Sequence, residues 1–182
     1  MSPVRWEVFK QDSEDKPHQA VGSVHAADAD GALLNARHVF ARRPAAISLW
    51  VVEATAIYSW TAEELIDVKA AAAKYEPTSG RLDATATNYL VFRKTSNRRS
   101  MTFVDHCGGV VAESPAAALK AALERYREVA VLAWWLVPDE SLRASAAEDA
   151  ASWFDPAREK TYKQQSAYGR VTPTGSQERR TR

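Results

Sequence analysis

The side chains best suited to catalysis or metal binding in this 182-residue sequence are four histidines and one cysteine. His25 stands close to Asp28 and Asp30, a spacing that a metal cluster could use, but Asp28 also precedes an apolar helical pattern and is expected to cap a helix. His106 and Cys107 could form a nucleophile pair, yet neighbouring residues of a strand point to opposite faces. Structural roles are favoured for both groups, so the sequence predicts no catalytic, cofactor-binding or metal-binding residue in this chain.

The sequence motifs of several large enzyme classes are absent. There is no Gly-rich phosphate loop, no Gly-x-Ser-x-Gly elbow and no Cys-x-x-Cys pair. No histidine follows a glutamate by three residues, the spacing that a carboxylate-bridged di-iron site requires on its helices. A single cysteine excludes an internal disulfide and any multi-cysteine zinc or iron–sulfur site.

The composition is that of an ordinary globular protein, with 46% hydrophobic residues, 26% charged residues and a formal net charge of +1. Because this charge is close to zero, nothing draws the chain as a whole to nucleic acid or to an anionic membrane. No apolar run approaches the roughly 20 residues that span a bilayer, and the first ten residues lack the apolar segment of a signal peptide. We therefore expect a cytoplasmic protein with no membrane or nucleic-acid partner.

Two stretches of the sequence share one order of predicted elements: two strands, a helix and a third strand. In the first, the predicted segments are strands at 5–10 and 18–25, a helix from Asp28 to Pro44, and a strand at 47–54. In the second, they are strands at 88–94 and 101–111, a helix that starts at Ser114 and Pro115, and a strand that carries Trp135. The copies lie about 86 residues apart, which is too far for a solenoid repeat and fits two copies of one small domain.

The predicted fold class is α+β, with two β-β-α-β units related by a pseudo-twofold axis and antiparallel sheets with helices packed on one face. Each unit alone would leave a strand edge and a sheet face uncovered, and pairing the units would cover both. The predicted divisions are a first unit at 1–60, a connecting helix and linker at 61–87, a second unit at 88–140, a C-terminal helix and tail at 141–168, and a disordered end at 169–182.

Two further helices are predicted outside these units. One covers 61–75, where Thr61 and Glu64 have the spacing of a capping box. The other is a short helix at 139–151, followed by an aromatic and polar segment without a clear period.

Two groups of residues remain as candidate binding features. Arg37, Arg42 and Arg43 end the first predicted helix and could bind a phosphorylated ligand such as an acyl-CoA, stabilise the helix end or meet an acidic partner surface. Trp153 and Phe154 lie in an otherwise polar segment, where large aromatic side chains either dock on a partner or fold back onto the chain.

Three further tryptophans belong to predicted strands. Trp50 and Trp135 occupy matching strands of the two units, and we expect both in the core. Trp134 must then face the other side of the sheet.

Several short stretches of the first unit carry a family resemblance, namely Trp6–Phe9, Val21–Asp28, Asn35–Arg37, Arg42–Arg43 and Leu49–Val52. Their order and spacing closely resemble the B-subunit family (PaaB) of the bacterial phenylacetyl-CoA epoxidase, a multicomponent ring monooxygenase of phenylacetate degradation. Phe154–Ala157, with Lys160 and Tyr162, resembles the C-terminal signature of that family.

The resemblance implies a role that the residues alone do not. In that family the di-iron centre belongs to a catalytic A subunit, which pairs with a structural C subunit, and a flavin and iron–sulfur reductase supplies electrons. The B subunit is a small non-catalytic protein that dimerises and bridges the A–C units, and no cofactor is expected in it. The candidate docking residues here are Arg37, Arg42, Arg43, Trp153, Phe154, Asp155, Pro156 and Tyr162.

The sequence departs from the family pattern by carrying two units before the tail, which implies a fused pseudo-dimer in place of a homodimer. The second unit has Val111–Ser114 and Arg127–Glu128 where the first has His25–Asp28 and Arg42–Arg43, so the halves have diverged. Two other functions stay open: an α+β domain that holds an acyl-CoA with its arginines, and nucleic-acid binding through the tryptophans and the tail residues Arg179, Arg180 and Arg182.

Overall fold

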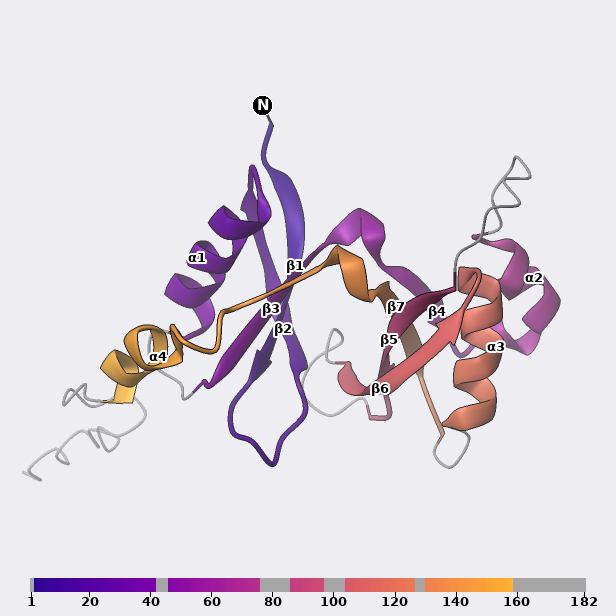
Figure 1. Ribbon diagram of the computed structural model, residues 1–182. Helices are drawn as coiled ribbons and strands as arrows, with labels where there is room; N and C mark the ends of the chain where they lie inside the picture. The colour runs from indigo at the N-terminus through magenta and orange to yellow at the C-terminus, as the bar shows by residue number, and fades with distance from the viewer. Residues whose placement is uncertain (1, 42–45, 76–85, 97–103, 127–129, 159–182) are drawn as a thin grey trace, which may run out of the picture.

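The strands of the described part of the chain form one eight-stranded sheet in which every pairing is antiparallel, with helices packed against it (Figure 1). The computed structural model describes residues 2–41, 46–75, 86–96, 104–126 and 130–158. The fold class is therefore α+β, as the sequence predicts.

The elements fall into two halves, residues 2–75 and 86–158. In the first half they are β1 (Val4–Gln11), β2 (Gln19–Ala26), α1 (Ala29–Phe40), β3 (Ser48–Glu53), the 3-10 helix η1 (Ala54–Ala56), β4 (Tyr58–Thr61), the 3-10 helix η2 (Glu64–Ile66) and α2 (Val68–Ala73). In the second half they are β5 (Thr87–Lys94), β6 (Asp105–Ala112), α3 (Pro115–Arg125), β7 (Ala133–Pro138), the 3-10 helix η3 (Asp139–Ser141), β8 (Leu142–Ala144) and α4 (Ala150–Arg158).

The two long helices begin where their capping residues predict. The Asp28 carboxylate accepts a hydrogen bond from the Gly31 amide at 2.7 Å, and the Ser114 hydroxyl accepts one from the Ala117 amide at 3.2 Å. Each cap satisfies one of the first-turn amides that a helix leaves without a partner. Both predicted helix starts are confirmed.

The halves exchange the segments that follow their third strands. The sheet order is β4-β7-β5-β6-β2-β1-β3-β8, so β4 from the first half pairs with β7, and β8 from the second half pairs with β3. Figure 1 shows the chain after β7 (orange) crossing from the second half toward α1 and the chain after β3 (magenta) crossing the other way. Each crossing covers a strand edge that would otherwise be open.

Three hydrophobic clusters hold the layers together. One lies between α1 and the β1–β3 side of the sheet, and a second lies between α3, α2 and the β5–β7 side. The third joins the halves directly, because Phe9 and Val52 pack there with Phe92 and Val137, and the rings of Phe9 and Phe92 are 4.4 Å apart. The sheet is thus buried on both faces near its centre.

The halves meet in the sheet at the β2–β6 seam, a short contact around the paired residues Gln19 and Asp105. The Gln19 amide donates to the Asp105 carboxylate at 2.7 Å. On either side the Ala20 amide donates to Val104 at 3.0 Å and the His106 amide donates to His18 at 2.9 Å. Among the described residues, the third cluster and the exchanged strands connect the halves in addition to these hydrogen bonds.

The two helices predicted outside the units are wrong in extent. Thr61 and Glu64 do form the reciprocal capping bonds, at 2.8 and 3.3 Å, but these close only η2, and Asp67 starts the separate helix α2. Residues 139–151 form η3, β8 and the start of α4 instead of one helix. The extended conformation of Asp67 interrupts the first predicted helix, whereas at residues 142–144 pairing with β3 outweighs local helix propensity.

We expect a chain cut within residues 76–85 to remain one complex. β4 and α2 stay attached to the first fragment but pack on the second, and β8 and α4 do the reverse. Size-exclusion chromatography of a chain with a protease site at 76–85 should show unchanged elution after cleavage and two fragments only in denaturant. Separation of the fragments in native buffer would contradict the exchange.

Candidate functional site: the α1–α4 junction

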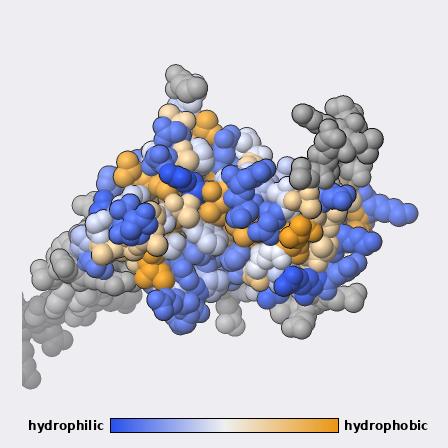
Figure 2. Space-filling model, viewed as in Figure 1, coloured by the Kyte–Doolittle hydropathy of each residue, from blue (hydrophilic) through white to orange (hydrophobic). Residues whose placement is uncertain are grey.

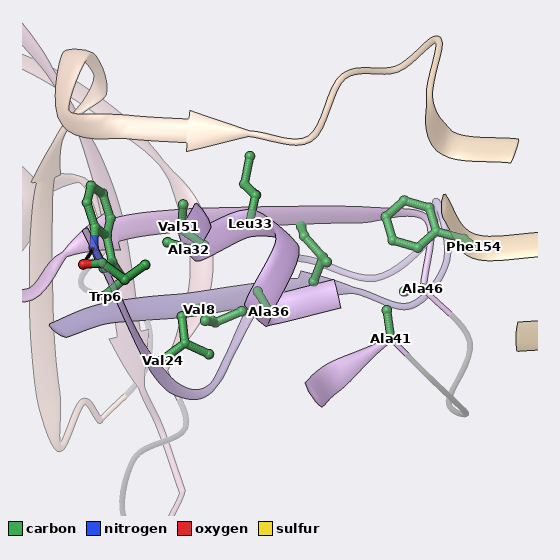
Figure 3. Close-up of a cluster of buried hydrophobic side chains, with 12 residues drawn as sticks. Trp6, Val8, Val24, Ala32, Leu33, Ala36, Ala41, Ala46, Val51 and Phe154 are labelled. Carbon is green, nitrogen blue, oxygen red and sulfur yellow. Dashed lines mark hydrogen bonds between the residues drawn. The ribbon is translucent and has the colours of Figure 1, made fainter. Parts of the chain in front are cut away.

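The candidate docking residues that the structure describes are gathered where α4 lies against α1. Phe154 is only 2% exposed and belongs to the same cluster as α1 residues Ala32 and Ala36. Figure 3 shows its ring beside Ala46, and both residues line a hollow with Ile47 and Ser48. Phe154 therefore folds back onto the chain and, in this conformation, offers no surface to a partner.

Arg37 binds α4 through hydrogen bonds to two backbone carbonyls. Its guanidinium donates to the Trp153 carbonyl at 3.1 Å and to the Ser152 carbonyl at 3.3 Å, and it lies over the Trp153 ring at 5.6 Å. Pro156 stands inside α4 and has no N–H, so the carbonyl four residues earlier, that of Ser152, lacks its helical donor. Arg37 supplies the donor that the proline removes.

We expect Arg37→Ala to lower the free energy of unfolding by about 1–2 kcal/mol, since hydrogen bonds from a charged donor contribute roughly that much. In a Pro156→Ala background the cost should fall, because the introduced alanine has the backbone N–H that the Ser152 carbonyl lacks. A double-mutant cycle by urea denaturation measures this coupling. Equal costs in the two backgrounds would contradict the role given to Arg37.

Of the other predicted docking residues, the structure describes only Asp155 and Pro156. Asp155 is half-buried, and Pro156 is exposed. Arg42, Arg43 and Tyr162 lie outside the described residues.

A groove that the sequence does not reveal lies between α1 and the segment that joins β8 to α4. It has a volume of about 620 Å³, with Leu34 and Trp153 among its apolar lining residues and Glu148 and Asp149 among its acidic ones. These residues come from parts of the chain more than 100 positions apart. The sequence carries no local signal for the groove, because the exposure of Leu34 depends on where β8 and α4 lie.

The residues whose side chains are most often used in catalysis make structural contacts in this fold. His25 is exposed and its carbonyl accepts a hydrogen bond from Asn35 at 3.0 Å, while Asp28 caps α1. Cys107 packs into the second cluster and donates to the Val91 carbonyl at 3.3 Å, whereas the His106 ring faces Trp50 on the other side of the sheet. Burial raises the pKa of Cys107 to about 11, so its thiol is protonated near neutral pH.

The His18 side chain is buried at the β2–β6 seam. Its ring stacks on Trp50 with the ring centroids 3.4 Å apart, and its Nε2 lies 3.0 Å from the Ser48 hydroxyl. Burial, with a smaller contribution from the charge of His106, lowers the pKa of His18 to about 4. Burial also lowers the pKa of His106. The halves therefore meet around two imidazoles that are neutral at pH 7.

The predicted core position of Trp50 and Trp135 is confirmed only in part, because both are half-buried, whereas the opposite facing of Trp134 is confirmed. Trp50 and Trp135 border the third cluster, and Trp134 is 3% exposed in the second cluster on the other face. Trp6 and Trp60 are also buried. Single-stranded nucleic acid is bound by stacking bases on accessible aromatic faces, and Trp6, Trp60 and Trp134 are too deeply buried for that role.

Most of the sequence matches the model of one known family. The model of the phenylacetic acid degradation B family matches residues 3–79 and 86–175. The chain belongs to this family. The two matched segments lie on either side of residues 80–85, so the likeness that the sequence shows most clearly in the first unit extends over the second.

A curated protein of phenylacetate metabolism is also similar to this member of the phenylacetic acid degradation B family. The chain is 45% identical over 67 residues to the B subunit of the 1,2-phenylacetyl-CoA epoxidase of Escherichia coli strain K12, an overlap of 35% of this chain and 70% of that protein. No solved structure matches the chain.

The described residues of this family member show neither a metal cluster nor a membrane span. No group of three or more His, Cys, Asp or Glu side chains is placed to hold a metal ion within the ranges that the structure covers. Across the same ranges, no helix has the length and apolar character needed to cross a membrane.

Proposed function

We propose that the chain is a non-catalytic assembly subunit of a multicomponent di-iron oxygenase that epoxidises the ring of phenylacetyl-CoA. The observation that carries the proposal is membership of the phenylacetic acid degradation B family, together with a relative named as the B subunit of the epoxidase. In this role the chain bridges a catalytic A-type subunit and a structural C-type subunit in the cytoplasm. The di-iron, flavin and iron–sulfur groups then belong to partner subunits.

The positions of the reactive side chains support a structural role. Asp28 caps a helix, His18 and His106 pack at the β2–β6 seam, and the Cys107 thiol is buried with a raised pKa. Each is accounted for by the fold itself. The surfaces of the chain, instead of an internal site, then carry its function.

We also infer that the halves are related by a pseudo-twofold axis and that the chain is a fused pseudo-dimer. The sheet order supports this, because β4-β7-β5-β6 in one direction has the same succession of roles as β8-β3-β1-β2 in the other. β1 and β5 have a register irregularity at the same place, between Val8 and Phe9 and between Val91 and Phe92. Gly22 and Gly108 have nearly equal φ angles of 140° and 137°.

The test is reconstitution with purified A-type and C-type subunits of the same complex. The isolated chain should contain no iron by elemental analysis and should not turn over phenylacetyl-CoA, and it should elute with the A and C subunits as one species. Failure to bind either subunit would overturn the proposal. Iron bound by the isolated chain would overturn its non-catalytic part.

The acyl-CoA alternative has weaker support. Arg37 is engaged with the carbonyls of α4, and Arg42 and Arg43 lie outside the described residues. The groove beside α1 is lined by Glu148 and Asp149, which repel the phosphates of coenzyme A, and its Arg143 is paired with Asp30. Calorimetric titration of the isolated chain with phenylacetyl-CoA separates the two functions, because tight binding would favour the alternative.

A further inference from the structure

The α1–α4 groove combines an apolar surface with a negative rim. Leu34 is 48% exposed there, and Trp153 is half-buried across from it. An exposed large apolar side chain beside a half-buried tryptophan is the composition of an interface centre more than of a solvated surface. Figure 2 shows apolar patches among hydrophilic residues over the part of the molecule where Figure 1 places α1 and α4.

The charge of the groove is unbalanced. Three acidic residues and one basic residue line it, namely Asp30, Glu148, Asp149 and Arg143. The guanidinium of Arg143 lies 3.1 Å from the Asp30 carboxylate. Asp30 is thereby neutralised, while Glu148 and Asp149 leave the rim negative. Side chains that approach this rim are favoured when they carry positive charge.

The buried face of α1 is repeated in α3. Ala32, Leu33 and Ala36 of α1 are buried, and α3 buries Ala118, Leu119 and Ala122 at the same steps along the helix. Both helices thus meet the same packing requirement of the sheet. This shared requirement does not account for any difference between the exposed faces of the two helices.

The exposed faces nevertheless differ in kind. Leu34 and Val39 of α1 are 48% and 61% exposed, whereas the matching positions of α3 are the exposed, charged residues Lys120 and Arg125. Asp30, at the groove, is matched by Ala116. At these three positions the first half is therefore apolar or acidic, and the second half has two basic residues and an alanine.

We propose that the α1–α4 groove receives an amphipathic segment of a partner subunit, and that the second half has no equivalent docking site. The apolar side chains of that segment contact Leu34 and Trp153, and its Lys or Arg side chains pair with Glu148 and Asp149. The inference rests on the proposed assembly function and adds to it a single, one-sided docking site on each chain. A pseudo-symmetric fold then binds its partner asymmetrically.

The decisive variant is Leu34→Lys, which places in α1 the residue that α3 carries. Its matched control is Lys120→Glu in α3. Both positions are exposed, so both variants should fold, and circular dichroism checks this. Binding of the full chain to immobilised A–C subunits is measured by biolayer interferometry. We expect Leu34→Lys to weaken binding roughly tenfold or more, and Lys120→Glu to leave it unchanged.

The charged rim is tested with Glu148→Lys combined with Asp149→Lys, which should weaken binding and reduce its dependence on salt. If the wild-type chain binds neither subunit, the assembly function itself is wrong. If the wild-type chain binds and Leu34→Lys binds equally well, only the groove assignment is wrong. Equal losses from Leu34→Lys and Lys120→Glu would show docking on both halves and overturn the one-sided site.

Discussion

Gly108→Ala is expected to lower the free energy of unfolding by about 3 kcal/mol or more, from backbone strain and overpacking together. Gly108 has a φ of 137°, which side chains rarely allow. A Cβ added there would also fall on the Tyr126 hydroxyl, with the ring carbon that bears it at 3.3 Å. Tyr126 packs against the second cluster, so it cannot simply swing away.

Two variants separate strain from crowding in urea denaturation. Tyr126→Phe in the Gly108→Ala chain should recover the steric part of the loss and leave the backbone part. Gly109→Ala is the matched control, because its Cβ meets the end of the exposed Asn88 side chain at 3.0 Å, which can move. A Gly108→Ala chain as stable as the control would contradict the expectation.

The second large effect is a loss of stability in mild acid. The pKa of His18 is lowered in the fold to about 4 from 6.5, so the unfolded chain binds a proton more readily than the folded chain. The stability that neutral His18 provides is complete above pH 6.5 and is lost as the pH falls toward 4. Allowing for solvent screening, the loss should be about 2 kcal/mol.

His18→Phe should flatten this pH dependence, because phenylalanine keeps an aromatic ring against Trp50 and cannot be protonated. Free energies of unfolding at pH 7.5 and 4.5 measure the difference for each chain. His38→Phe, at an exposed position of α1, is the control for removing one imidazole. A His18→Phe chain with the acid loss of the wild type would contradict the assignment to His18.

The sequence predicts the two β-β-α-β series well because each signal is local. Asp28 and Ser114 with Pro115 mark helix starts through bonds within one turn, and alternating apolar residues mark the strands. The exchanged strands β4 and β8 are not predicted, since each is short and is defined by the strand that it joins. Phe154 likewise lacks a local pattern, and only the hollow beside Ala46 makes it a core residue.

The docking residues show the same limit from the functional side. The charge of Arg37 marks it as a candidate in the sequence, but its partners are the carbonyls of a helix that begins more than 100 residues later. Leu34 reads as one more apolar residue of an amphipathic helix, and its exposure depends on where β8 and α4 lie.

The exchange of strands has a consequence for synthesis on the ribosome. β3 ends at Glu53, yet its outer edge pairs with residues 142–144, which are made some 90 positions later. Until residues 142–144 are synthesised, the outer edge of β3 in the nascent first half is therefore unpaired. A strand with an unpaired edge is prone to associate with neighbouring chains. We expect truncated products that end before residue 142 to depend on chaperones far more than the full-length chain does.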